Sequence, residues 1–113
     1  MKKIEAVIRK SKFKDVKQQL IEENFSLFTY SLVRSISESS DKKIYRGVEM
    51  ESSASERVAL SLYVESNSVD RAISIIASAG TTGDADDARI YVFEVKEAMK
   101  LDSSGDKDKV TKV

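Results

Sequence analysis

The 113-residue chain contains no cysteine and no histidine. Without cysteine it can form no disulfide framework, no thiolate zinc site and no cysteine nucleophile. Without histidine it has no imidazole to act as a general base or a metal ligand. The carboxylates and lysines are scattered through polar segments, and their spacing suggests no acid–base pair. We therefore expect a protein that is not an enzyme and has no resident metal.

Excess charge and long apolar runs are also lacking. Nineteen basic and nineteen acidic residues give a formal net charge of zero, so no overall field attracts nucleic acid or an anionic membrane. Residues 1–13 lack the apolar core of a signal peptide, and no other run is long enough to span a bilayer. We expect a cytoplasmic protein without membrane insertion, in which 41% hydrophobic residues form one modest core.

The apolar periodicity predicts six elements in the order strand, helix, strand, strand, helix, strand. Alternating apolar residues predict strands at 3–9, 27–37, 57–64 and 89–95. The two helices are expected to begin at caps provided by Ser11 and Ser68 and to end near Asn24 and Gly80. This order is typical of a ferredoxin-like α+β domain, with an antiparallel sheet and both helices on one face. Residues 1–101 would form it, followed by a flexible tail at 102–113.

A long polar segment, residues 35–56, separates the second and third strands and has Tyr45-Arg46-Gly47 at its centre. Connections of this length in compact domains are usually functional or disordered. The segment is either a loop that binds a partner or an ordinary solvated turn. On the strands, four aromatic residues are expected in the core or at a subunit interface: Phe28, Tyr30, Tyr91 and Phe93.

Three stretches closely resemble the PII family of nitrogen-regulatory signalling proteins: KKIEAVIRKSKFKDVKQQL, YRGVEM and AGTTGDADDARIYVFEV. The resemblance implies a homotrimer whose sheets face inward, with three ligand clefts between subunits. It also implies that the 35–56 segment is a T-loop, which responds to bound nucleotide and 2-oxoglutarate and docks on a transporter, enzyme or transcriptional partner. The implied partner-binding residues are Tyr45, Arg46, Gly47, Glu49 and Met50.

The stretch that resembles the family's nucleotide loop departs from its pattern. Asp84 stands where the family commonly has lysine, and Asp86 and Ala88 replace two glycines. Two extra carboxylates would repel phosphate by ~1 kcal/mol each in a solvated site. After the last strand, Lys100 stands for one family arginine and Asp102 for the other. The residues that still match define the candidate nucleotide site: Arg57, Thr82, Gly83, Asp87, Arg89 and Lys100.

The loop departs from the family as well. Met50 stands where many members carry a tyrosine that is uridylylated, and Val48 stands where others carry a phosphorylated serine. Residues 35–40 lack the glutamine that helps to hold magnesium and 2-oxoglutarate. We therefore expect nucleotide and 2-oxoglutarate sensing to be altered or weakened. ADP or ATP remains a possible effector, and no cofactor is required.

Several interpretations stay open. The protein could be a trimeric module that docks constitutively without sensing, or a PII-like sensor of bicarbonate or another nucleotide in carbon or metal transport. An RNA-recognition module is disfavoured, because residues 57–64 lack the basic and aromatic signature of that class. The acidic run 84–87 offers oxygen ligands for magnesium or calcium, but it lacks the spacing and central glycine of a calcium-binding loop.

Overall fold

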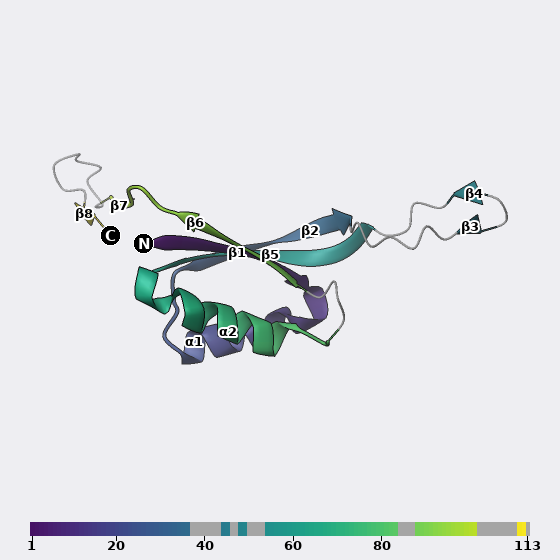
Figure 1. The fold of residues 1–113 in the computed structure, drawn as a ribbon, viewed down its shortest axis with the longest axis horizontal. Coiled ribbons are helices and arrows are strands. Elements are labelled where there is room, and N and C mark those ends of the chain that lie inside the picture. The colour runs from purple at the N-terminus through teal and green to yellow at the C-terminus, as the bar shows by residue number, and fades with distance from the viewer. Residues whose placement is uncertain (37–43, 46–47, 50–53, 84–87, 102–110, 113) are drawn as a thin grey trace.

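A computed structural model of the chain describes residues 1–36, 44–45, 48–49, 54–83, 88–101 and 111–112 (Figure 1). The main sheet and its helices comprise β1 (Lys2–Arg9), α1 (Phe13–Glu22), β2 (Phe28–Ile36), β5 (Ala54–Val64), α2 (Val69–Gly80) and β6 (Ala88–Glu94). The short strands are β3 (Ile44–Tyr45), β4 (Val48–Glu49), β7 (Met99–Lys100) and β8 (Thr111–Lys112). The six predicted elements are confirmed in their predicted order.

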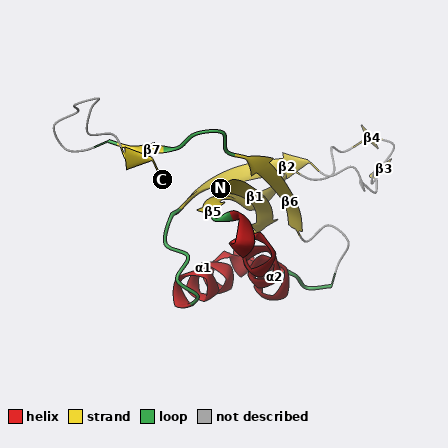
Figure 2. Cartoon of the chain, turned by 60° about the vertical axis from the view of Figure 1, so that its left-hand side comes forward, coloured by secondary structure: helices red, strands yellow, loops and turns green. Residues whose placement is uncertain are grey.

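The main sheet has the strand order β2-β5-β1-β6, and every neighbouring pair is antiparallel. Both helices cover the same face of this sheet, and the other face carries no helix (Figures 1 and 2). This is the predicted ferredoxin-like α+β arrangement. Among the described residues, no helix is long and apolar enough to cross a membrane.

The core lies between the sheet and the two helices. Ile4, Ala6 and Ile8 alternate along the central strand β1 and are fully buried, because they lie on the face of the sheet that the two helices cover. The register places Leu62 and Leu60 of β5 directly opposite Ile4 and Ala6, and both are also fully buried. The buried residues of the helices complete the layer: Val16, Leu20, Ala72, Ile75, Ile76 and Gly80. Burying each large aliphatic side chain contributes ~1.5–3 kcal/mol.

The predicted serine caps are wrong. Ser11 lies inside a 3-10 turn, Lys10–Lys12, so that Lys12 takes the N-cap position of α1 and no side chain caps the helix. Ser68 does occupy the N-cap of α2, but its backbone is already helical rather than extended. Its hydroxyl therefore lies 3.4 Å from Oδ1 of Asn67 instead of accepting from the helix backbone. A second 3-10 turn, Ser66–Ser68, precedes α2, so that each helix continues directly from a 3-10 turn.

The predicted helix ends are confirmed, for two different reasons. Asn24 follows α1 with φ of 67°, the left-handed conformation that asparagine tolerates. Gly80 ends α2 and is followed by an extended Thr81. A Cβ at Gly80 would lie 3.3 Å from Cγ2 of Val16 and 3.7 Å from Cγ2 of Ile8. The glycine thus allows α2 to approach both α1 and β1 closely.

Of the predicted tail, 102–113, the structure describes residues 111 and 112. Their backbone forms β8 and pairs with β7, with Lys100 opposite Thr111. The division of the chain into a domain and a flexible tail stays a prediction.

Candidate functional site

The stem of the long insertion is a regular hairpin. β2 and β5 pair from Phe28 opposite Leu62 to Ile36 opposite Ala54, so the chain leaves the main sheet after Ile36 and returns at Ala54. The Ser55 hydroxyl lies 3.5 Å from the carbonyl oxygen of Ser35, near the end of this stem. A rigid ladder therefore supports the point from which the insertion departs (Figure 1).

Two predicted partner-binding residues lie in a second small ladder. Tyr45 is on β3 and Glu49 is on β4, which pair as Ile44 opposite Glu49 and Tyr45 opposite Val48. Arg46, Gly47 and Met50 lie outside the described residues.

Arg57 and Arg89 come together on the helix-free face of the sheet. Arg57 on β5 lies opposite Arg9 of β1, and Arg89 on β6 lies opposite Val7 of β1. Because positions 7 and 9 share one face of a strand, the two predicted arginines lie on the same side of the sheet. They line a hollow of about 170 Å³, whose other lining residues include Ser35 and Ser55 of the insertion stem.

Neither Arg57 nor Arg89 forms a side-chain hydrogen bond or ion pair with a described residue. Guanidinium groups have a planar arrangement of donors that matches carboxylates and phosphates. The hollow is therefore suited to a small oxyanion held between two strands.

A second opening, of about 530 Å³, adjoins the first at Arg57. It is lined by Arg9, Lys10, Ser11, Glu56 and Arg57. Lys10 Nζ lies 3.4 Å from Oε2 of Glu56, and both side chains are more than half exposed, so this pair contributes little to stability. Among the described residues of this lining, Glu56 provides the only carboxylate, against two arginines and one lysine. The described lining is thus basic even though the chain has no net charge.

Three of the other predicted nucleotide residues are not part of the described lining of the arginine hollow: Thr82, Gly83 and Lys100. Thr82 and Gly83 follow α2 and are exposed. Gly83 has φ of 94°, a conformation that side chains rarely adopt, and nothing lies within 4 Å of the position of a Cβ there. Lys100 is on β7 and exposed, and Figure 1 places β7 at the end of the sheet away from the β3–β4 ladder. Asp87 lies outside the described residues.

The helix-free face also presents aromatic side chains. Tyr91 and Phe93 of β6 and Tyr63 of β5 are 48%, 47% and 38% exposed. Tyr91 and Phe93 are therefore outside the core of this chain. Tyr30, on the helix side, is also largely exposed, but its ring packs on Phe13 with centroids 4.4 Å apart.

Sequence reasoning missed Arg9 as a member of this site. Arg9 and Val7 are two residues apart in the first strand, so the period of two could have placed both on the face opposite Ile8. The same period places Arg57 and Arg89 on that face of the sheet. The strand register that sets Arg9 beside Arg57 is a tertiary feature.

The family model described as "Nitrogen regulatory protein P-II" matches residues 1–104. The chain belongs to the PII family of signalling proteins. It is 32% identical over 102 residues to the "Nitrogen regulatory protein P-II" of Rhodospirillum rubrum, covering 89% of this chain and 91% of that protein. The protein of that name from Haemophilus influenzae is similar to the same degree, 32% over 102 residues with the same coverage. The one from Synechocystis is 29% identical over 109 residues, covering 96% of each chain. The predicted family resemblance is confirmed.

Proposed function

We propose that this PII protein is a trimeric regulator that controls a transporter or enzyme through the 35–56 insertion, with altered nucleotide and 2-oxoglutarate sensing. One observation carries the proposal. The hollow that Arg57 and Arg89 line is also lined by Ser35 and Ser55, a pair at the end of the stem from which the insertion departs. An anion in the hollow would therefore contact the element that presents the insertion to a partner.

The size of this effect is limited. A hydrogen bond to a charged group contributes ~1.5–3 kcal/mol, whereas fixing one backbone residue costs ~1–2 kcal/mol. Two guanidinium bonds can thus offset the ordering of only a few residues. An anion would act by fixing the direction in which the insertion leaves the stem, and a partner would order the remainder. Such an effector shifts the loop only if it binds one loop arrangement more tightly than another.

The exposed aromatics of the helix-free face support the trimer. Tyr63, Tyr91 and Phe93 would lose their contact with water if three sheets faced inward around a common axis. In such an assembly residues of a neighbouring chain complete the ligand cleft beside the arginine hollow. We assign that part to four residues of the predicted nucleotide site, Thr82, Gly83, Asp87 and Lys100.

The volume of the hollow favours a second candidate, a sensor of a small oxyanion such as bicarbonate. Ligand pockets commonly measure about 300–1,000 Å³, and a single chain offers about 170 Å³ between its arginines. The two extra acidic residues, 84 and 86, of the sequence also oppose the binding of a polyphosphate. The two candidates differ in effector and agree on the site.

Isothermal titration with ADP and ATP, each with and without magnesium and 2-oxoglutarate, and with bicarbonate, tests both candidates. We expect at least one of these anions to bind the wild type and to bind Arg57→Gln and Arg89→Gln much more weakly. Lys14→Gln, which removes an exposed charge from α1, is the matched control and should bind like the wild type. Absence of binding to the wild type would refute the sensing proposal and leave a constitutive docking module.

A further inference from the structure

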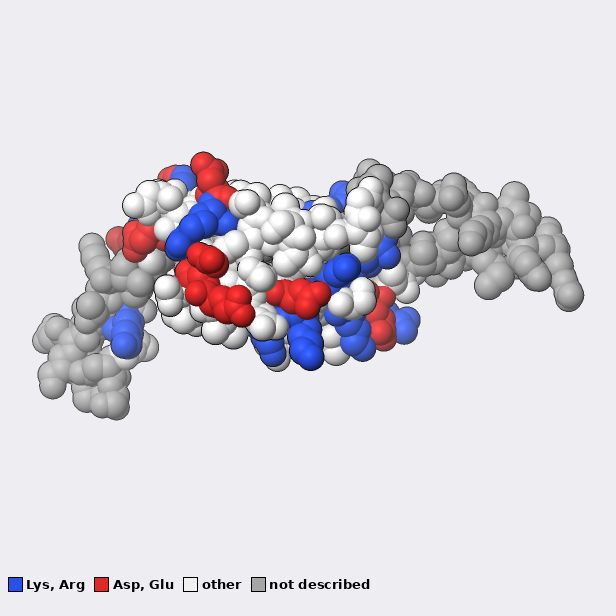
Figure 3. All heavy atoms as spheres, turned by 90° about the horizontal axis from the view of Figure 1, so that it is seen from below, with Lys and Arg blue, Asp and Glu red and all other residues white. Residues whose placement is uncertain are grey.

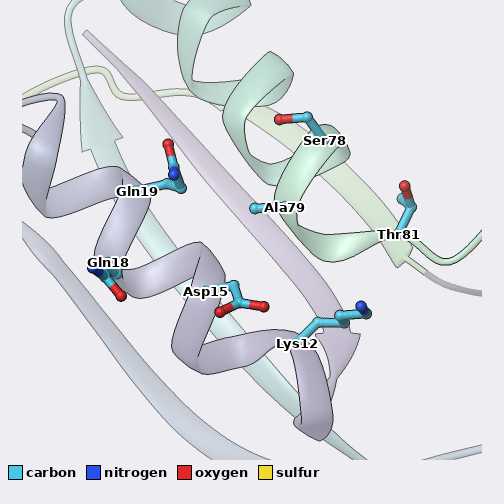
Figure 4. A pocket seen from close by; sticks show the side chains of 7 residues that line it. All are labelled: Lys12, Asp15, Gln18, Gln19, Ser78, Ala79 and Thr81. Carbon is cyan, nitrogen blue, oxygen red and sulfur yellow. The ribbon is translucent and has the colours of Figure 1, made fainter.

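A groove lies between the two helices, on the face of the domain opposite the arginine hollow (Figure 4). It measures about 450 Å³, which is within the range of about 300–1,000 Å³ typical of small-molecule sites. Across it, two small residues near the end of α2, Ser78 and Ala79, face the longer side chains of α1 and its preceding turn. The close packing of Gly80 on Val16 sets the helix separation at this point.

Among the described residues that line the groove, one is a cation and one is an anion. Lys12 and Asp15 both line it, and neither forms an ion pair or hydrogen bond with any residue in the described part of the chain. Gln19 contributes a carboxamide that has no partner there either. In contrast, the Thr81 hydroxyl donates to the Ala77 carbonyl at 2.7 Å. The groups still available to a ligand are thus an ammonium, a carboxylate and an amide.

These charges select the kind of ligand. A simple anion attracted by Lys12 would be repelled by Asp15 in the same groove, and a simple cation would meet the reverse problem. A molecule that carries both charges can satisfy both groups at once. We propose that the α1–α2 groove binds a small zwitterion of the α-amino acid class, with its carboxylate toward Lys12 and its ammonium toward Asp15.

The surrounding charges support this orientation. Lysines gather at the beginning of α1, at positions 10, 12, 14 and 17, and glutamates occupy positions 22 and 23 at its end. On the helical face, acidic side chains predominate toward one end and basic side chains toward the other (Figure 3). A carboxylate is therefore drawn to the end of the groove at which Lys12 lies. Because Lys12 and Asp15 remain accessible to water, we expect a millimolar dissociation constant.

Amide chemical-shift titration of the full-length protein tests the proposal with three probes: L-serine, L-serinamide and N-acetyl-L-serine. The second lacks the carboxylate and the third lacks the ammonium. At about pH 6 the amine of serinamide carries its proton, so the probes differ in one charge each. We expect L-serine to give saturable shifts around the groove and each analogue to bind about two- to fivefold more weakly.

Two variants test which residue of the groove contacts each charged group of L-serine. Lys12→Gln should bind L-serine and L-serinamide equally, and Asp15→Asn should bind L-serine and N-acetyl-L-serine equally. Lys14→Gln, whose exposed side chain does not line the groove, should retain all the wild-type preferences. The proposal is overturned if L-serine causes no saturable shifts in the groove, or if the charge preferences survive in both variants.

Discussion

Replacing Arg57 with glutamine should stabilise the protein in the absence of an anion. Arg57 lies directly opposite Arg9, and Arg89 lies on the same face across the strand that separates them. Like charges that face each other across a ladder destabilise it by roughly 0.2–1 kcal/mol. Two unit charges about 8 Å apart in water repel by ~0.5 kcal/mol, which agrees with that range. We therefore expect Arg57→Gln to raise the free energy of unfolding by about 0.5 kcal/mol.

Urea denaturation at low ionic strength measures this change. The protein concentration must be the same for every variant, because the stability of an oligomer depends on it. Arg57→Lys retains the charge and should show no gain. Salt at about 1 M shortens the screening length to ~3 Å, so the advantage of Arg57→Gln should shrink there.

An anion that binds the hollow should make the wild type more stable than Arg57→Gln. At ten times its dissociation constant a ligand stabilises the native state by ~1.4 kcal/mol, a gain that Arg57→Gln would largely lose. The reasoning is refuted if Arg57→Gln is less stable than the wild type at low salt without an anion. In that case the guanidinium makes net stabilising contacts, and the hollow is structural.

Three further predictions concern other parts of the chain. Gly80→Val should lower the free energy of unfolding by about 1–3 kcal/mol through overpacking against Val16. The control Ser74→Val, at an exposed position of α2, should lower it less. Equal losses in urea denaturation would contradict the packing role of Gly80. Lys2 pairs with the Glu94 carboxylate and lowers its pKa, so the stability it adds is present above the ordinary carboxyl pKa and is lost as the pH falls through the lowered value. In a pH series of denaturation curves, the stability difference between wild type and Glu94→Gln should accordingly shrink once the pH falls below the ordinary carboxyl pKa, and it should disappear below the lowered pKa of Glu94. A difference that grows on acidification would refute the assigned sign. Arg46→Ala should abolish capture of the regulated partner and leave the oligomer intact; dissociation in light scattering would instead make Arg46 structural.

The order of elements could be predicted because the buried residues repeat with simple periods. Ile4, Ala6 and Ile8 alternate on β1, and Val16 and Leu20 are one helical turn apart. The helix starts could not be predicted in the same way. Serine is a good cap only where its backbone is extended, and the 3-10 turns remove that conformation.

The candidate site was predictable only in part. The family resemblance predicted Arg57 and Arg89 as site residues. They line the same hollow because β1 pairs with β5 on one side and with β6 on the other. The same pairing places Arg9, which no motif marked, opposite Arg57 and in the lining of the adjoining opening. The position of β7, which carries Lys100, at the end of the sheet away from the β3–β4 ladder is equally a property of the tertiary fold (Figure 1). Residues from distant segments form a site through strand register, which a local pattern does not specify.

The arginine hollow and the α1–α2 groove lie on opposite faces of one sheet, and we expect them to bind their ligands independently. The layer between them is closely packed: Ile8 and Val16 are fully buried and both lie near Gly80. Two sites are coupled only through an element that has a second arrangement, and this packing leaves no space for one. The dissociation constant of L-serine should therefore be the same with and without a saturating anion. Because coupling is reciprocal, titrating the anion in the presence of L-serine gives a second measurement of the same factor. A change of more than about fivefold in both, which corresponds to ~1 kcal/mol of coupling, would show that β1 and the helices shift together and that the core has two packed states.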